Sequence, residues 1–509
     1  MQAGSAWDKS VSRKQQDSIN VSVLGRNALI YSMGNLGLRA GSFLLIPLYT
    51  HALPIDRYGA LASLLMVAQV LGMCMDAGTR KAFTRFAAEF EGNGRMHQLV
   101  GTSIALTLLC SGIVTLLANI LLRPFFVSIV GKDDLLSYTF LTCGAAVTQC
   151  LFANIVTYYA ARNEGARFTR LCLVALFVLI AVSSVLLFVF QLGIKGALCA
   201  QIVTYGSLWV IGTLQVVWKV GIGFSISLMR RLAVYGFPLV FAMSGDLVTD
   251  ATSIFFLGRF AGLSQVAIYS IGSKLAQLAT LILINPFQVA CEPFVYSHLG
   301  KPQIGPTIGK LLTYLMLAFA FVACGIAFVS RDLLSIVTPK EYSPAYSVML
   351  LLLPGIAFRG IYYIGECLLN IRRKTHIAGI SVGGFTILSV ILNYLLIRSW
   401  GVYGAVVVFN VTIVGTALVV MAMGLKAFPI RLEPRRLMTS AALAASLLLC
   451  IATLRHSAAY LYYTIIPVTV FAGIAFLVMG GFFDEEEWSY IRTFVGKMRA
   501  KQRAGAYGV

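Results

Sequence analysis

Residues 311–330 read LLTYLMLAFAFVACGIAFVS, a run of 20 residues without a charged side chain. A helix rises about 1.5 Å per residue, so about 20 apolar residues cross the roughly 30 Å hydrocarbon core of a bilayer. The strands of a membrane barrel are half as long, at about 10 residues, and alternate in polarity. This run is apolar on every side, and it therefore predicts a membrane-spanning helix.

Similar runs recur along the whole chain and predict an all-α polytopic membrane protein with about 14 transmembrane helices. The predicted spans are residues 27–51, 58–79, 100–122, 137–160, 170–190, 194–217, 235–258, 264–286, 309–330, 345–370, 376–397, 401–425, 438–454 and 460–481. The loops between them are short, and the largest leave no room for a soluble domain on either face.

The composition agrees with this prediction. Of 509 residues, 58% are hydrophobic and only 12% are charged, whereas a soluble domain carries roughly 25% charged residues. So few charges exclude a water-soluble enzyme, a disordered chain and a disulfide scaffold. The formal charge of +20 is scattered between apolar runs rather than gathered on one polar face, as a nucleic-acid binder would need.

The basic residues predict the orientation, because cytoplasmic loops are enriched in Lys and Arg. The side that carries both termini has 28 of these residues and the opposite side has 9, when basic residues at the end of a span are counted with the adjoining loop. We therefore expect an even number of helices, both termini in the cytoplasm, and a multi-pass protein of the cytoplasmic (inner) membrane. Residues 1–26 are polar, and we therefore expect no signal peptide.

Internal similarity indicates a duplication. Gly193 to Ala197 and Gly401 to Ala405 both read G-x-x-G-A, 208 residues apart. An offset of six helices keeps both halves in the same orientation, which predicts a parallel repeat of two pseudo-symmetric six-helix bundles plus two C-terminal helices. The expected parts are an N-tail (1–26), an N-terminal bundle (27–217), a linker (218–234), a C-terminal bundle (235–426), helices 13 and 14 (427–481) and a tail (482–509).

The linker and the tail both combine apolar residues at helical spacing with basic residues. Ile226, Leu228, Leu232 and Val234 accompany Arg230-Arg231 in the linker. Both segments are predicted to be amphipathic helices on the anionic cytoplasmic leaflet.

Charges within predicted spans are expensive and usually face a polar cavity. Arg39, Lys274 and Arg359 lie at similar depth on helices of both bundles, and they are the candidate cationic binding zone for a phosphate group. Asp246, Asp250 and Glu366 are candidate cavity carboxylates that could bind a coupling H⁺ or Na⁺. The alternative is that these residues form structural ion pairs. Asp76 and Arg80, near the cytoplasmic end of the second span, are expected to pair locally.

Glycines and prolines accompany several of these charges. Gly37 and Gly41 flank Arg39, Pro238 precedes Asp246, and Pro354 precedes Arg359. Such residues permit close helix packing or helix kinks. We retain both interpretations, with gating bends as the working hypothesis.

Several motifs resemble those of one known family. They are Asn35-Leu36-Gly37-Leu38-Arg39, Leu45-Ile46-Pro47-Leu48, Tyr58-Gly59, Asp76-Ala77-Gly78 and Arg85-Phe86. With the G-x-x-G-A openings, they resemble the oligosaccharide-lipid (O-antigen-type) flippases of the polysaccharide transporter family, within the multidrug/oligosaccharidyl-lipid/polysaccharide exporter superfamily.

The resemblance implies that a polyprenyl-diphosphate-linked oligosaccharide, the repeat unit of a cell-surface polysaccharide, crosses the membrane by alternating access through a cationic cavity. It implies no cofactor other than a coupling H⁺ or Na⁺, and it makes polysaccharide polymerases and glycosyltransferases the candidate partners. The alternatives are a cation-coupled drug or small-solute antiporter of the same fold and a lipid II-type flippase. A membrane enzyme is disfavoured, because Asp133-Asp134 lies in a loop too short to hold an acceptor.

Overall fold

A computed structural model describes residues 41, 43–131, 134–299, 303–454, 459–479 and 482. Every regular element among these residues is helical, and 12 helices are long and apolar enough to cross a membrane. The count rises to 13 if the bent pair Ile226–Val240 and Gly245–Phe260 is one span. The all-α polytopic prediction is therefore confirmed. The first predicted span lies largely outside the described residues, which include only its apolar end, Phe43–Ala52, so the count of 14 stays a prediction.

The chain forms two compact units. The first comprises Met1–Ile271, Ile336–Ala345 and Val382–Phe409, and the second comprises Gly272–Ser335, Tyr346–Ser381 and Asn410–Val509. Helices wholly in the first unit are α3 (Ile55–Asp76), α4 (Thr79–Gly92), α5 (Met96–Leu121), α6 (Arg123–Val130), α7 (Leu135–Ala161), α8 (Gly165–Ser184), α9 (Gly193–Val220), α10 (Ile226–Met243) and α11 (Gly245–Phe260). Helices wholly in the second are α13 (Asn285–Ser297), α18 (Pro434–Leu454) and α19 (Ala459–Met479). Helices with residues in both are α12 (Leu263–Ala279), α14 (Ile304–Val337), α15 (Pro344–Ile371), α16 (Thr375–Trp400) and α17 (Val402–Ala427).

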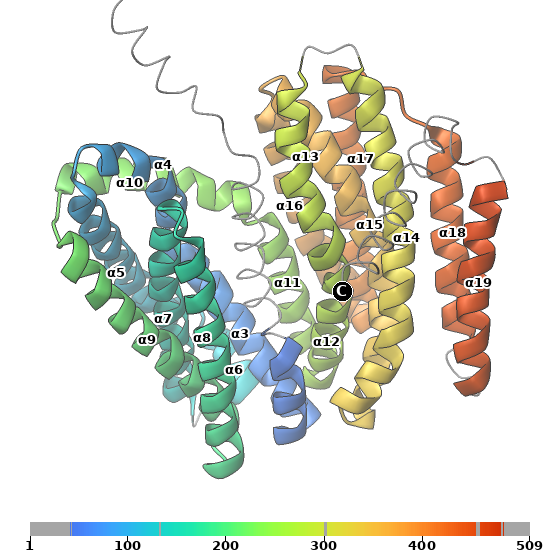
Figure 1. Cartoon of the computed structure of the whole chain (residues 1–509). Helices are drawn as coiled ribbons and strands as arrows, with labels where there is room; N and C mark the ends of the chain where they lie inside the picture. The colour runs from blue at the N-terminus through green and yellow to red at the C-terminus, as the bar shows by residue number, and fades with distance from the viewer. Residues whose placement is uncertain are drawn as a thin grey trace, which may run out of the picture. The chain divides into compact units, whose positions relative to one another are not determined.

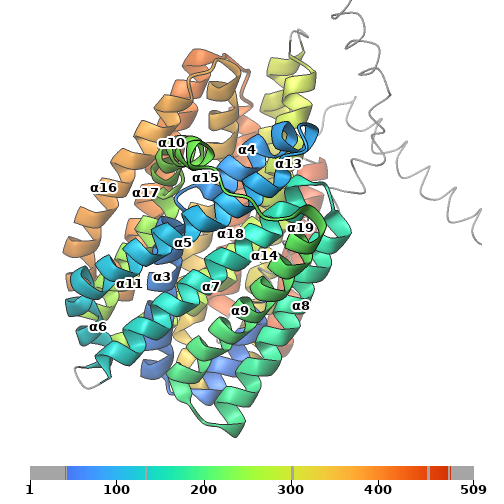
Figure 2. The ribbon, with the colours of Figure 1, turned by 90° about the vertical axis from the view of Figure 1, so that its left-hand side faces the viewer.

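Helix α7 is the centre of the first unit and packs against α9, α3 and α5 (Figure 2). Its buried face mixes large side chains, such as Tyr158, with small ones, and Ala145 and Ala146 are fully buried. Small side chains let helix backbones approach closely, which is the main source of packing energy where lipid is as apolar as the protein.

Helix α10 extends across the predicted boundary between the linker and the C-terminal bundle at residues 234 and 235 (Figure 1). It packs on α4 and α5. Leu228 and Leu232, which we expected on a membrane-facing surface, are buried in a hydrophobic cluster with residues of α4 and α5, whereas Ile226 and Val234 are exposed. The linker therefore completes the core of the first unit. Contact of its exposed face with the leaflet stays a prediction.

Local structure recurs at the offset of the predicted repeat. Gly193 has a φ of 57°, and a Cβ on it would lie 3.9 Å from the Leu53 side chain. Gly401, 208 residues later, has a φ of 54°, and its Cβ would lie 3.7 Å from Ala261, which is 208 residues after Leu53. The two glycines of G-x-x-G-A thus make equivalent turns against equivalent positions, which supports an internal duplication.

In the second unit, α19 packs on α14 through aromatic and polar contacts. The Tyr462 ring stacks on Phe328 with centroids 5.3 Å apart, and its hydroxyl donates to the Phe328 carbonyl at 3.2 Å. The Arg331 guanidinium lies 4.2 Å from the centroid of the same ring. The C-terminal pair α18 and α19, which lie side by side in Figure 1, is thereby attached to the rest of the unit.

Backbone packing in the first unit predicts the effect of a single methyl group. A Cβ on Gly59 of α3 would lie 1.8 Å from the Leu263 carbonyl oxygen. Gly59→Ala should therefore separate two backbones and lower the free energy of unfolding by about 1–3 kcal/mol. Thermal unfolding in detergent measures this.

Gly112→Ala is the matched control, because Gly112 is also helical and nothing lies within 4 Å of the position that a Cβ would take there. Alanine at this position should be neutral or stabilise by up to about 1 kcal/mol. An unchanged melting temperature for Gly59→Ala would contradict the close approach.

Candidate functional site

The site residues predicted from the sequence are divided between the two units. Arg39 and Gly37 lie outside the described residues. Gly41, Pro238, Asp246 and Asp250 belong to the first unit, and Lys274, Pro354, Arg359 and Glu366 belong to the second.

In the first unit, the two aspartates lie one turn apart on α11, where Asp246 is exposed and Asp250 is partly buried. Gly41 is buried, and a Cβ on it would lie 2.7 Å from the Leu176 side chain. Pro238 lies inside α10, and the segments Ile226–Val240 and Gly245–Phe260 meet at 59°. A gating function for these positions stays a prediction.

In the second unit, Lys274, Arg359 and Glu366 are all partly buried. Arg359 and Glu366 lie on α15, which runs from Pro344 to Ile371 as one helix through Pro354. The assignment of these residues to substrate or coupling ion stays a prediction as well.

The first unit contains a cavity that the sequence did not reveal. Its volume is about 890 Å³. The lining residues are Gln69, Gly72, Met73, Asp76, Gly78, Arg80, Lys81, Thr84, Gln149, Cys150, Phe152, Ala153, Val156, Thr157, Ala160, Phe168, Tyr205, Leu239, Val240 and Leu247. They come mainly from α3, α4 and α7, with single residues from α8 and α9 and a wall from α10 and α11.

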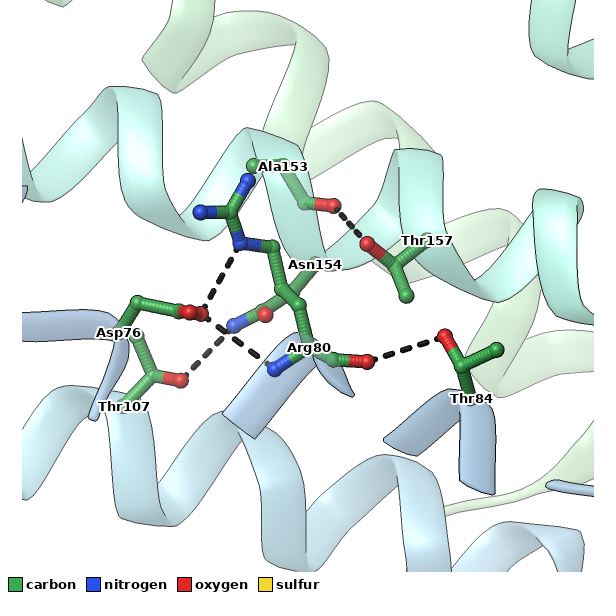
Figure 3. Close-up of polar contacts among 7 residues, drawn as sticks. All are labelled: Asp76, Arg80, Thr84, Thr107, Ala153, Asn154 and Thr157. Carbon is green, nitrogen blue, oxygen red and sulfur yellow. Dashed lines mark hydrogen bonds and ion pairs between the residues drawn. The ribbon is translucent and has the colours of Figure 1, made fainter. Parts of the chain in front are cut away.

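An ion pair between Asp76 and Arg80 lies at this cavity, as the local pairing predicted from the sequence requires (Figure 3). The Asp76 Oδ1 accepts a hydrogen bond from the Arg80 Nε at 3.0 Å and a longer one from the Arg80 backbone N–H at 3.4 Å. Asp76 is buried, whereas 46% of the Arg80 side chain is exposed. The pair is partly solvated, so it contributes about 1 kcal/mol or less to stability.

The turn between helices α3 and α4 produces this geometry. Ala77 and Gly78 have left-handed φ values of 46° and 72°, and they turn the chain between the two helices. A Cβ on Gly78 would lie 2.1 Å from the Gly236 carbonyl oxygen of α10, so only glycine fits there. The turn places Arg80 in the first turn of α4, beside the carboxylate that ends α3.

The ion pair leaves part of the guanidinium available. Asp76 engages the Arg80 Nε, and in Figure 3 the two terminal nitrogens of Arg80 point away from the carboxylate. Lys81 lines the same cavity, so two cations and one carboxylate give the lining a net positive charge. Such a lining attracts an anion, and arginine can bind phosphate oxygens by two parallel hydrogen bonds.

The neutral part of the lining offers hydrogen bonds and aromatic surface. Gln69 and Gln149, which carry amides, are among the lining residues. The Thr157 hydroxyl donates to the Ala153 carbonyl at 2.8 Å, so its oxygen can still accept a hydrogen bond. Phe152 and Tyr205 lie with ring centroids 5.3 Å apart. The buried Asn154 amide, next to Ala153 of the lining, donates to the Thr107 hydroxyl at 2.8 Å and joins α7 to α5 (Figure 3).

A helical pattern in the sequence could have revealed this site. Gln69, Gly72, Met73 and Asp76 recur at intervals of three or four residues, which places them on one face of α3. Gln149, Ala153, Val156, Thr157 and Ala160 do the same on α7. Two faces of small and polar residues, each interrupting an apolar span, are a signal that the facing helices enclose a polar space. Among the described residues, no group of three His, Cys, Asp or Glu side chains could hold a metal ion.

Comparison with known proteins gives one family match. Residues 24–295 match the model of a family described as polysaccharide biosynthesis protein. A search of curated proteins gave no match.

Solved structures show the same fold. The lipid II flippase MurJ in an inward closed conformation has a TM-score of 0.65 at 12% identity, over 89% of this chain and 98% of that one. A mutant of the Vibrio cholerae MATE transporter VcmN has a TM-score of 0.56 at 16% identity, over 84% and 98%. A transporter of the MOP superfamily from Pyrococcus furiosus has a TM-score of 0.55 at 12% identity, over 82% and 95%. The chain therefore has the fold of this superfamily of membrane transporters.

The charge of the cavity predicts a preference between thiol reagents. In a full-length protein without its 10 native cysteines, Thr157→Cys should react faster with an anionic than with a cationic methanethiosulfonate, by about tenfold after normalisation to a free thiol. Replacing Arg80 and Lys81 together by alanine should remove this preference.

Thr142→Cys is the control, because Thr142 lies on the same helix but is fully buried and outside the cavity lining. It should stay unreactive. Equal normalised rates at Thr157→Cys with both cations present would refute a cationic cavity.

Proposed function

Because the chain belongs to the polysaccharide biosynthesis protein family, we propose that it is a flippase for a polyprenyl-diphosphate-linked oligosaccharide. In this proposal, the repeat unit of a cell-surface polysaccharide such as O-antigen or exopolysaccharide moves from the cytoplasmic to the outer leaflet by alternating access. The protein acts as a transporter and not as an enzyme.

The observation that carries the proposal is the cavity with Arg80 and Lys81 in a chain that has few charges. A diphosphate is the group whose charge and oxygen geometry match a guanidinium and an ammonium in one lining. The amides of Gln69 and Gln149 and the hydroxyl of Thr157 suit a neutral glycan, which needs many weak hydrogen bonds. One cavity thus offers groups for both parts of the substrate.

The cations predicted within the spans offer further contacts for the diphosphate beyond this cavity, and we call the whole series the cationic path. Arg80 and Lys81 follow the cytoplasmic end of the second predicted span, whereas Arg39, Lys274 and Arg359 are expected near mid-membrane. We propose that the diphosphate first binds near Arg80 and Lys81 and then passes to the interior cations. Asp246, Asp250 and Glu366 are the proposed coupling carboxylates for H⁺ or Na⁺.

Two alternatives share this fold. A cation-coupled antiporter is favoured by the carboxylate of Asp76 in the cavity wall, but Arg80 neutralises that carboxylate and Lys81 would repel a cationic drug. A lipid II-type flippase would use the same diphosphate chemistry, and only the glycan attached to the lipid distinguishes it.

The proposed setting is the cytoplasmic (inner) membrane, with both termini in the cytoplasm. There the exposed face of the linker would contact anionic headgroups, and so would the predicted amphipathic tail, which lies outside the described residues apart from residue 482. Polysaccharide polymerases or glycosyltransferases would supply and consume the substrate.

Charge reversal tests the cationic path. Arg80→Glu and Arg359→Glu should each lower glycan export by about tenfold or more, because each removes a charge-assisted contact to phosphate. Surface polysaccharide and accumulated lipid-linked glycan are measured in cells that carry the variant as their only copy. Arg123→Glu, which changes an exposed residue at the start of α6, should export normally. Normal export in both test variants, at normal protein levels, would contradict the cationic path. Accumulation of lipid II in the variants would favour the alternative flippase.

Amide substitution tests the coupling carboxylates. Asp246→Asn or Asp250→Asn cannot take up and release a proton, so transport by the variant should lose its dependence on an imposed ion gradient in proteoliposomes. If the dependence is unchanged in both variants, the aspartates are structural and the coupling proposal is wrong.

A further inference from the structure

The segment Ile336–Ala345 connects α14 to α15 but packs elsewhere. It belongs to the first unit, whereas the preceding residues through Ser335 and the following residues from Tyr346 belong to the second. In the proposed orientation, it is a loop on the outer face. The chain therefore leaves the second unit, contributes this segment to the first, and returns within ten residues.

Tyr342 is one contact of this segment with the first unit. Its side chain is 1% exposed, and its ring meets the ring of Tyr58 edge to face, with centroids 5.9 Å apart. The Thr50 hydroxyl lies 3.4 Å from the Val337 carbonyl oxygen. Tyr58 is itself buried at the start of α3, next to Gly59, whose close approach to the Leu263 backbone fixes this part of the first unit.

The local sequence presents Tyr342 as the one buried side chain of a short turn. Pro339 precedes a short 3₁₀ turn, Lys340–Tyr342, and Pro344 begins α15. The Tyr342 backbone N–H donates to the Pro339 carbonyl at 3.1 Å. Lys340 and Glu341, on the same turn, are exposed. Two prolines restrict the segment before it docks, which reduces the entropy lost on docking.

One feature opposes permanent docking. The Tyr342 hydroxyl is buried and has no hydrogen-bond partner among the described residues. A buried hydroxyl without a partner has lost its water and gained nothing in return. Withdrawal of the ring would hydrate it, so the docked form is held by aromatic packing and weakened by the hydroxyl.

We propose that Ile336–Ala345 is an outer latch, which is closed when the Tyr342 side chain packs against Tyr58 and the segment contacts Thr50. This inference rests on the proposed alternating-access function. While Tyr342 is docked, the outer ends of α14 and α15 are tied to the first unit. Opening toward the outside requires Tyr342 to withdraw from Tyr58, and closing restores this contact.

Thiol labelling in intact cells measures the latch without any knowledge of the substrate. In the cysteine-free full-length protein, Lys340→Cys should react quickly with a membrane-impermeant maleimide, and Thr338→Cys, whose native side chain is 5% exposed, should react more slowly by about tenfold. Adding Tyr342→Ala should speed the reaction at Thr338→Cys. Adding Tyr342→Phe, which keeps the ring and removes the buried hydroxyl, should slow it.

Equal rates at the two positions, or no effect of Tyr342→Ala, would overturn the latch. Failure of Lys340→Cys to react until the cells are lysed would place the segment on the inner face and would overturn it as well.

A reversible lock then tests the link to transport. Tyr58→Cys with Tyr342→Cys, joined by a short reducible bis-methanethiosulfonate, should stop export, and a reductant should restore it. Each single variant treated in the same way should keep exporting. Export at the untreated rate by the cross-linked double variant would show that the contact is static and refute the latch. If the protein proves not to carry a glycan, the labelling results still decide the latch, so the two proposals fail separately.

Discussion

The need to satisfy every backbone N–H and C=O inside hydrocarbon governs this structure. Helices meet that need along almost the whole described chain. Irregular backbone inside a membrane protein is tolerated where protein or a polar cavity surrounds it. The turn at Ala77 and Gly78 is such a place, since it adjoins the cavity and the Asp76 carboxylate accepts a hydrogen bond from the backbone N–H of Arg80. The turn between the two helices and the polar cavity thus depend on each other, because the backbone groups freed by the turn need polar surroundings. Without such surroundings, the unpaired backbone groups would be energetically unfavourable.

Features that depend on neighbours along the chain were predicted well. Spans are predicted from the lengths of apolar runs, and 12 long apolar helices confirm the all-α polytopic fold, whereas the count of 14 stays a prediction. The pairing of Asp76 with Arg80 follows from their spacing of four residues and is confirmed at 3.0 Å. The G-x-x-G-A motif predicted a duplication, and the structure adds that its first glycine has a left-handed φ in both copies.

Features that depend on distant packing were missed. The cavity needs α3, α4 and α7 to face one another, and no local pattern fixes which faces meet. Leu228 and Leu232 have the spacing of a membrane-surface helix, and the same spacing serves equally well for packing on α4 and α5. Tyr342 lies in a short loop whose composition gives no indication of a partner some 280 residues earlier. The depth of Arg39 was inferred, but its surroundings lie outside the described residues.

The placement of Leu228 and Leu232 has a consequence for how such proteins can recombine. A gene fusion that exchanges halves at the end of α9 would give the N-terminal half a linker helix from another parent, and two core positions would then be filled by foreign side chains. A crossover after Met243 would carry α10 with the helices it packs against. Such an exchange would therefore have to keep α10 with the six predicted spans of the N-terminal half.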